Sequence, residues 1–262
     1  MEPLAFDAHC HVDAGRLNPA AVWGVAGVVV AGVTPAGFPE QCRAAAQLRG
    51  LGCAAGTTLG LHPWLVPSDT TVLRVALADL AHTLERSDPH LVAVGETGLD
   101  RTTASSDAQW AGQMQALEAQ LDLARSRDLP VVLHVVRAHA ECMRCLRRVG
   151  VPPAGLQVHA FWGSLELVEA WTRLDAHLSI GPAVVARRSS KRAAALASIP
   201  EDRLLVETDA SAEAEDGRPT DVWPVIRCLA DIRGQTASHI AVRTAENARR
   251  LFGLDKDSAT PS

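Results

Sequence analysis

Two histidines near the start of the chain are spaced so that they could bind one metal ion. His9 and His11 lie in a mostly apolar run, residues 4–11, which predicts a β-strand. Side chains alternate between the two faces of a strand, so both imidazoles would project from one face, about 7 Å apart along it. Imidazole is a common metal ligand, and two on one face can hold the same ion. The pair alone is a weak signal, because most such pairs are ordinary surface or core histidines.

Further residues that bind metals or move protons end the later apolar runs. They are His62, Glu96, His134, His159 and Asp209. A carboxylate at the end of a buried strand is costly unless a cation compensates it. Four imidazoles (His9, His11, His134, His159) and two carboxylates (Glu96, Asp209) suit Zn²⁺, Mn²⁺, Co²⁺ or Ni²⁺, with Mg²⁺ less favoured. Six ligands are too many for one tetrahedral ion, but they fit two divalent ions that share a carboxylate.

Strands and helices alternate along the chain to position these residues. Apolar or β-branched runs predict eight strands, at residues 4–11, 24–33, 53–61, 91–96, 129–135, 156–161, 176–181 and 204–208. Amphipathic, alanine-rich segments between them predict helices that include residues 40–49, 70–86, 107–127 and 165–174. Ser106 is expected to cap the third of these helices.

This alternation predicts an α/β fold, a (β/α)₈ TIM-type barrel of the metallo-dependent hydrolase kind. Near-continuous apolar strands are typical of a parallel sheet covered by helices. We expect a single domain over residues 1–253 and a polar, frayed tail over 254–262. The carboxyl ends of barrel strands meet on one face, which would bring the scattered candidate ligands into one cavity. An open doubly wound sheet is the alternative, but such a sheet usually has a glycine-rich loop where this chain has His9 and His11.

Composition indicates a globular cytoplasmic protein. Hydrophobic residues make up 47% of the chain and charged residues 21%. No run of about 20 apolar residues predicts a membrane span, and no basic segment with an apolar core predicts a leader. The six cysteines lack a framework spacing, which predicts reduced thiols. A net charge of −5 argues against a broad nucleic-acid-coating surface but leaves room for a small positive site.

Seven segments spread along the chain resemble the TatD family of metal-dependent deoxyribonucleases. They are FDAHCHVD (6–13), GLHPW (60–64), VGETGLD (94–100), LPVVLH (129–134), VHAFWGS (158–164), LLVETDA (204–210) and NARRLFG (247–253). The resemblance therefore covers nearly the whole chain and keeps the order of its motifs.

This resemblance implies a role for each candidate ligand. His9 and His11 would bind one ion with Asp209, and His134 and His159 would bind the second. Glu96 would bridge the two ions, and Asp209 would also accept the proton of the attacking water. The implied reaction is hydrolysis of a phosphodiester, in this family typically exonucleolytic trimming of DNA.

The residues expected to contact substrate follow the family pattern only in part. His62 resembles the family's histidine beside the metals and is expected to contact either phosphate or a metal-binding side chain, with a purely structural role as the alternative. The family usually has an arginine where this chain has Val136, and Arg137 follows one step later, so its side chain reaches the site only if a loop turns it back. The chain has no tyrosine to stack bases. Trp64 and Trp162 are candidates for that stacking, with packing of the barrel rim as the alternative.

Two charged segments are expected near the cavity. Residues 210–219 form an acidic loop that would repel a polyanion. Arg187, Arg188, Lys191 and Arg192 follow the seventh strand, where such barrels often bind phosphate, although a solvated helix face is the alternative. The short tract after the fourth strand and residues 180–183 resemble the TatD-like subunit of the Qat antiphage system.

Three functions are compatible with these features. The first is a two-metal phosphodiesterase acting on DNA or a smaller nucleotide. The second is an amidohydrolase-type hydrolase of amides, lactones or rings, a class that resembles this arrangement but commonly bridges its ions with a carboxylated lysine where this chain has Glu96. The third is a non-enzymatic partner subunit of a defence complex, against which the retention of all six ligands argues.

Overall fold

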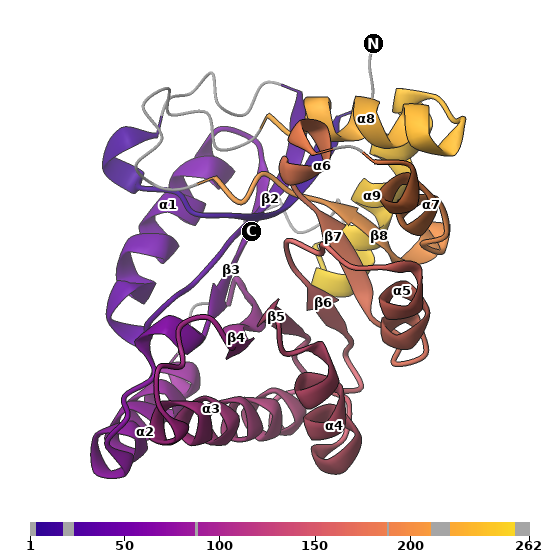
Figure 1. Cartoon of the computed structure of the whole chain (residues 1–262). Coiled ribbons are helices and arrows are strands. Elements are labelled where there is room, and N and C mark those ends of the chain that lie inside the picture. The colour runs from indigo at the N-terminus through magenta and orange to yellow at the C-terminus, as the bar shows by residue number, and fades with distance from the viewer. Residues whose placement is uncertain (1–3, 18–23, 87–88, 188, 211–220, 255–262) are drawn as a thin grey trace.

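Eight parallel strands form one sheet in the order in which they occur in the sequence (Figure 1). The computed structural model describes residues 4–17, 24–86, 89–187, 189–210 and 221–254. The strands are β1 (Ala5–Cys10), β2 (Val25–Val30), β3 (Ala54–Leu59), β4 (Leu91–Asp100), β5 (Val131–Val136), β6 (Leu156–Val158), β7 (His177–Ile180) and β8 (Leu204–Val206). A sequential order excludes the open doubly wound sheet, in which the strand order reverses.

Backbone hydrogen bonds between the first strand and the segment after the last one bring the sheet close to a closed barrel. The N–H of Asp209 donates to the carbonyl of His9 at 3.0 Å, and the N–H of His11 donates to the carbonyl of Ala210 at 2.9 Å. The residues that join the two edges are therefore among those predicted to bind metal.

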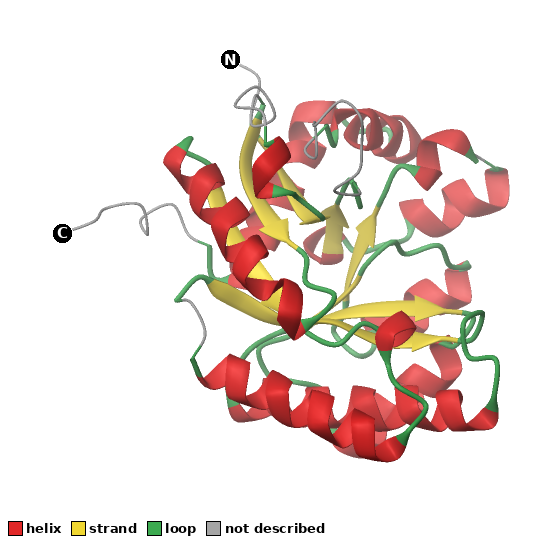
Figure 2. Ribbon diagram, turned by 90° about the vertical axis from the view of Figure 1, so that its left-hand side faces the viewer, coloured by secondary structure: helices red, strands yellow, loops and turns green. Residues whose placement is uncertain are grey.

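Helices surround the strands on the outside (Figures 1 and 2). They are α1 (Phe38–Gly50), α2 (Thr70–Glu85), α3 (Asp107–Ser126), α4 (His139–Val149), α5 (Leu165–Thr172), the short α6 (Ala183–Ala186), α7 (Ser190–Ala197), α8 (Trp223–Arg233) and α9 (Ala237–Phe252). The four predicted helices are confirmed as α1, α2, α3 and α5. The Ser106 hydroxyl caps α3 as predicted, because it accepts from the N–H of Gln109.

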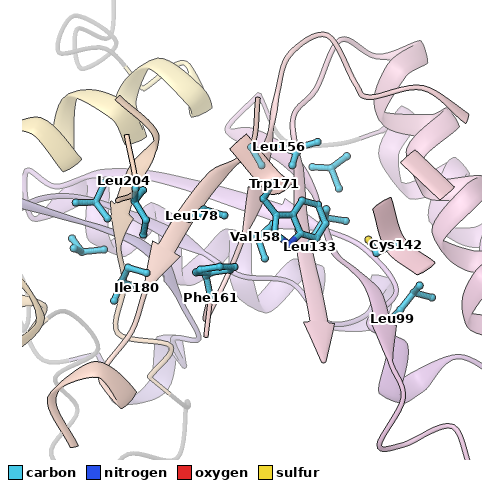
Figure 3. Close-up of a cluster of buried hydrophobic side chains, with 14 of the residues drawn as sticks. Leu99, Leu133, Cys142, Leu156, Val158, Phe161, Trp171, Leu178, Ile180 and Leu204 are labelled. Carbon is cyan, nitrogen blue, oxygen red and sulfur yellow. The ribbon is translucent and has the colours of Figure 1, made fainter. Parts of the chain in front are cut away.

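An apolar layer between strands and helices holds the barrel together (Figure 3). Leu133, Leu156, Leu178 and Leu204 come from four consecutive strands and belong to the same buried cluster as Trp171 of α5. Burial of each such side chain contributes roughly 1.5–3 kcal/mol to folding. This layer stabilises a barrel whose interior carries polar groups. Among them, the side chain of Gln157 on β6 donates to the carbonyl of Ala8 at 3.4 Å.

The fourth strand departs most from its predicted bounds. It was expected to end at Glu96, but it continues to Asp100, so Glu96 lies within the strand. The pairing of β4 with β5 changes register between Val94 and Thr97, and such an irregularity re-aims the side chains beside it. Gly98 is required here, because its φ is +142° and a Cβ would lie 2.0 Å from the carbonyl oxygen of His134.

Several other predictions can be compared with the described residues. All six cysteines are free thiols, as predicted. None of the described helices is long and apolar enough to cross a membrane. Leu254 is buried rather than part of a frayed tail, since it packs in a cluster with Phe6 and Phe252. Residues 255–262, Arg188 and positions 211–219 of the acidic loop lie outside the described residues.

His177 of β7 is expected to make the fold less stable in acid. It is 7% exposed, and both of its ring nitrogens are buried. Burial lowers the pKa of His177 to about 4, and the positive charges of Arg203 and Arg250 act in the same direction, whereas the negative charge of Asp175 opposes them. The unfolded chain binds this proton near pH 6.5, so protonation favours unfolding as the pH falls from about 6.5 towards 4. This group alone should remove about 2 kcal/mol between pH 7 and pH 5.

Urea unfolding of the wild type and of His177→Leu at both pH values tests this prediction. Leucine has a side chain of similar size to histidine but cannot bind a proton. The variant should lose about 2 kcal/mol less than the wild type on acidification. Equal losses in the two proteins would contradict the prediction, since all other titrating groups are shared.

Candidate metal centre

The carboxylate of Glu96 lies at the focus of the predicted ligands. Its Oε2 atom is 2.9 Å from Nε2 of His159 and 3.6 Å from Nε2 of His9. Its Oε1 atom is 3.4 Å from Nε2 of His11. The Glu96 side chain is only 2% exposed. Imidazoles from β1 and from the end of β6 thus face one buried carboxylate on β4.

Asp209 completes a first group of ligands. Its Oδ1 atom lies 3.8 Å from Nε2 of His9 and 3.7 Å from Nε2 of His11. The three side chains present ligand atoms that all lie within 4.8 Å of one another, as a shared ion requires. The structure therefore brings together the first predicted set.

His134 and His159 form a second group with Glu96. Nδ1 of His134 lies 3.0 Å from Nε2 of His159 and 3.9 Å from Oε2 of Glu96. Both imidazoles thus direct a nitrogen towards the same carboxylate. This is the arrangement expected of the second predicted set, with Glu96 between the two sets.

The unsatisfied atoms of this cluster fit a cation. Nε2 of His9 and Oε1 of Glu96 both face the cluster and are buried without a hydrogen-bond partner of suitable distance and angle in the described part of the chain. Burying polar atoms in this way costs free energy that a bound cation would offset. Nitrogen and carboxylate oxygen donors together suit borderline divalent ions. The residues present therefore fit the metal dependence inferred from the sequence.

The protonation states of His11, His134 and Glu96 favour metal binding. Burial lowers the pKa of both His11 and His134 to about 4, so that each imidazole is neutral near pH 7. Burial opposes ionisation of Glu96, but His9 and His159 together outweigh it and hold the pKa of Glu96 well below its usual range. Neutral imidazoles and an ionised carboxylate are the forms that bind metal. Burial opposes protonation of His9 and His159, but Glu96 and Glu207 outweigh it and raise the pKa of both imidazoles, so a bound ion would displace their protons.

His62 lies beside Glu96, but its hydrogen bonding indicates that the nitrogen facing Glu96 is a hydrogen-bond donor rather than a metal ligand. Its Nδ1 accepts from the N–H of Trp64 at 3.1 Å, so a neutral ring carries its hydrogen on Nε2. That Nε2 is 3.6 Å from Oε2 of Glu96. Its position alone would also allow His62 to bind an ion with Glu96 and His134. A nitrogen that carries hydrogen has no free lone pair, so this tautomer favours a contact with substrate.

Asp100 is the main residue of the site that the sequence analysis missed. Its Oδ2 accepts from the indole N–H of Trp64 at 2.6 Å and lies 3.4 Å from Nε2 of His134. Its Oδ1 accepts from the N–H of Thr102 at 2.8 Å. One buried carboxylate thus fixes the tryptophan and orients His134, whose Nδ1 is left facing Glu96. The acidic residue that ends the apolar run of β4 was the available signal.

Two further buried carboxylates support the segments that carry ligands. The two oxygens of Asp7 accept from the N–H of Thr208 at 3.0 Å and from its hydroxyl at 2.6 Å. Glu207 accepts from the N–H of Ala160 at 2.6 Å and lies 3.7 Å from Nδ1 of His159. Both lie in motifs that resemble the TatD family, but neither residue was predicted to have a role in the site. They connect β1, the end of β6 and the end of β8.

The predicted substrate contacts lie around the rim. Trp64 is 62% exposed, and its ring centroid is 4.8 Å from that of His62. Arg137 is exposed just after β5 and has a left-handed backbone, with φ of +51°. Trp162 is half-buried, and the guanidinium of Arg192 lies 3.3 Å from its ring centroid. Arg192 thus packs on an aromatic ring, unlike a residue on a fully solvated helix face.

Known proteins resemble this chain over nearly its whole length. The family described as TatD related DNase matches residues 6–253. The chain belongs to the TatD family. An uncharacterised metal-dependent hydrolase of Escherichia coli K12, YjjV, is 32% identical over 262 residues, which cover 95% of this chain and 97% of YjjV. A protein named 3'-5' ssDNA/RNA exonuclease TatD, from Dickeya dadantii, is 33% identical over 241 residues, 87% of each chain.

Solved structures confirm the barrel. The crystal structure of YjjV superposes with a TM-score of 0.79 at 31% identity and covers 96% of this chain and 98% of that one. A phosphotriesterase homology protein of Escherichia coli has a TM-score of 0.71 at 16% identity, covering 96% and 98%, which shows a shared fold alone. The predicted family and fold are thus confirmed, and the chain is a TatD-type metal-dependent hydrolase.

Asp100→Asn is expected to weaken the binding of the ion that His134 would hold by about 10- to 100-fold, the usual effect of losing a carboxylate that orients a metal-bound imidazole. The amide keeps the size of the side chain but removes its charge. Calorimetric titration of the metal-free protein with Mn²⁺ measures the change. Asp122→Asn, at an exposed carboxylate on α3, is the matched control. Unchanged affinity in Asp100→Asn would show that Asp100 does not support the metal centre.

Proposed function

We propose that this chain is a two-metal phosphodiesterase that trims DNA from an end. The observation that carries the proposal is the buried carboxylate of Glu96, which faces His9, His11 and His159 within 3.6 Å. Relatives named 3'-5' ssDNA/RNA exonuclease TatD, at 31–33% identity, support a nucleic-acid substrate. The six free cysteines support a cytoplasmic location, where thiols stay reduced.

The proposed ligands form two sets around one bridge. His9, His11 and Asp209 would hold one divalent ion, His134 and His159 the other, and Glu96 would contact both. The ions would be Zn²⁺, Mn²⁺, Co²⁺, Ni²⁺ or Mg²⁺, and when bound they would stabilise negative charge on the phosphoryl group. Four positive charges against the two carboxylates leave a net charge of about +2, which attracts an anionic substrate.

Asp209 is the proposed proton acceptor. Its side chain is 39% exposed, whereas that of Glu96 is 2% exposed, so Asp209 is the proposed carboxylate ligand that water can reach. Burial raises the pKa of Asp209 in the metal-free protein, and a carboxylate that water can reach is able to accept its proton. Asp209 takes one proton from the attacking water, whose oxygen bonds to phosphorus while a P–O ester bond breaks. Asp209 then gives that proton to the departing oxygen, which leaves as a hydroxyl group and restores the carboxylate.

Residues on the rim would position the substrate. The Nε2–H of His62 would donate to a phosphate oxygen. The exposed ring of Trp64, held by Asp100, offers a face for a single-stranded base. Arg137 would reach a phosphate because its left-handed backbone changes the direction of its side chain relative to β5. Trp162 would contact a second part of the strand.

Hydrolysis of amides or lactones is the second candidate, since it shares this fold. Two-metal enzymes of that class commonly bridge their ions with a carboxylated lysine on the fourth strand. This chain has two lysines, Lys191 and Lys256, and neither lies on β4. Glu96 at that position therefore favours the phosphodiesterase.

An activity panel tests the proposal. Purified protein loaded with Mn²⁺ or Mg²⁺ is incubated with single-stranded DNA, duplex DNA, RNA, bis(4-nitrophenyl) phosphate and a lactone. Single-stranded DNA should be cleaved, and a chelator should stop the reaction. Asp209→Asn should lower kcat about 10²- to 10⁴-fold, the usual contribution of a general base. Turnover of the lactone with every phosphodiester left intact would overturn the proposal.

Glu96→Gln is expected to lose both ions, because the amide keeps the size of the side chain but not the charge or the second oxygen ligand. Elemental analysis after dialysis measures the ions per chain, and circular dichroism checks that the variant folds. Glu141→Gln, on the outer helix α4, should keep the wild-type metal content. Two ions per chain in folded Glu96→Gln would refute the bridging assignment.

A further inference from the structure

A small cavity lies beside the metal centre, between the ends of β6, β7 and β8. Its volume is about 260 Å³, and its lining includes Phe161, Trp162, Pro182, Ala183 and Asp209. Because Asp209 is part of the lining, the cavity begins at a proposed metal ligand. Its volume is below the roughly 300–1,000 Å³ of pockets for drug-sized ligands. The cavity therefore has room for one nucleoside rather than for a run of them.

An arginine that is not part of the cavity lining contacts the tryptophan of this cavity. The guanidinium carbon of Arg192 lies 3.3 Å from the ring centroid of Trp162, a close cation–π contact. The hydroxyl of Ser189 accepts from the N–H of Arg192 at 3.3 Å and caps α7, which fixes the start of the helix that carries the arginine. One face of the indole is thus covered by a cation. The ring is left as a flat, positioned wall of the cavity.

The lining separates an apolar part from a polar part. Phe161, Pro182 and Ala183 join Trp162 in providing apolar surface, whereas Asp209 lies on the side of the metal centre. A nucleoside 5'-phosphate has the same division, with a planar base at one end and an anion at the other. Stacking on an aromatic ring accepts any base, because every base has a π-face.

We propose that this cavity binds the terminal nucleoside of a DNA strand, with its base stacked on Trp162 and its phosphate at the metal centre. The proposal rests on the phosphodiesterase function proposed above. It explains how the enzyme selects chain ends, because an internal nucleotide would need room for the strand to continue on both sides. Arg192 is then a positioning residue that holds the stacking ring.

Binding of a product tests the cavity without turnover. The Mn²⁺-loaded protein is titrated in a calorimeter with thymidine 5'-monophosphate and with deoxyribose 5-phosphate, which lacks the base. The nucleotide should bind about 10- to 100-fold more tightly, as expected for one stacked base. In Trp162→Ala the ratio of the two affinities should fall to about one. Trp162→Phe should keep most of the wild-type ratio, and Arg192→Gln should lower it.

Trp110→Ala is the matched control. Trp110 also has an arginine over its ring, with Arg101 at 4.4 Å from the centroid, but it is absent from the lining of the cavity. The binding ratio should therefore be that of the wild type. A ratio near one in the wild type, or a wild-type ratio in Trp162→Ala, would overturn the proposal.

Cleavage assays separate this proposal from the proposed function. Linear single-stranded DNA should be degraded, circular single-stranded DNA should resist, and a linear strand with abasic residues at both ends should be cut about 10- to 100-fold more slowly. If no phosphodiester is cut, the proposed function fails and this inference falls with it. If linear and circular DNA are cut equally, end trimming and the terminal-nucleoside site are both wrong, and only the two-metal phosphodiesterase activity stands. If circular DNA resists but terminal bases make no difference, only the terminal-nucleoside site is wrong.

Discussion

The buried negative charge of Glu96 is the constraint on which the rest of the site depends. An isolated carboxylate inside a barrel is strongly unfavourable, and its cost falls when positive charge or hydrogen-bond donors lie within a few ångströms. Histidines from β1 and from the ends of β5 and β6 supply the nitrogens that can hold such charge. The backbone bonds that join β1 to the segment after β8 run through His9 and Asp209. The same backbone contacts that join the edges of the barrel therefore also bring His9 and Asp209 together.

Acidic side chains that bind no substrate hold this arrangement in place. Asp7 ties β1 to Thr208, Glu207 holds the backbone at Ala160, and Asp100 orients His134. Each is buried, so each must accept hydrogen bonds to remain in the fold. The cost of burying these polar groups is offset by the apolar layer outside the strands, where leucines pack against helices. The leucines that pack against the helices and the candidate ligands thus lie on opposite faces of the same strands.

The sequence was sufficient to predict the barrel, because every strand is a distinct apolar run and its ligands stand near the run's end. It was also sufficient to predict that the candidate ligands lie near one another, since parallel strands bring their carboxyl ends together. Their division into two metal-binding sets stays a prediction. The sequence could not show that β4 continues past Glu96, because the register change beside Gly98 depends on the neighbouring strand. The role of Asp100 was missed for the same reason. The contact between Arg192 and Trp162 joins segments that no local pattern relates.

Fold alone does not decide the reaction, because barrels only 16% identical to this one share its architecture. The charge of the site is a better guide to the reaction than the fold. The whole chain carries a net charge of −5, so its long-range field does not attract a polyanion. Attraction must therefore be local, and the proposed ions provide it within a few ångströms of Glu96. A substrate held in this way needs few basic residues but does need surfaces that stack bases. In a chain without tyrosine, the tryptophans at the rim are the residues suited to that task.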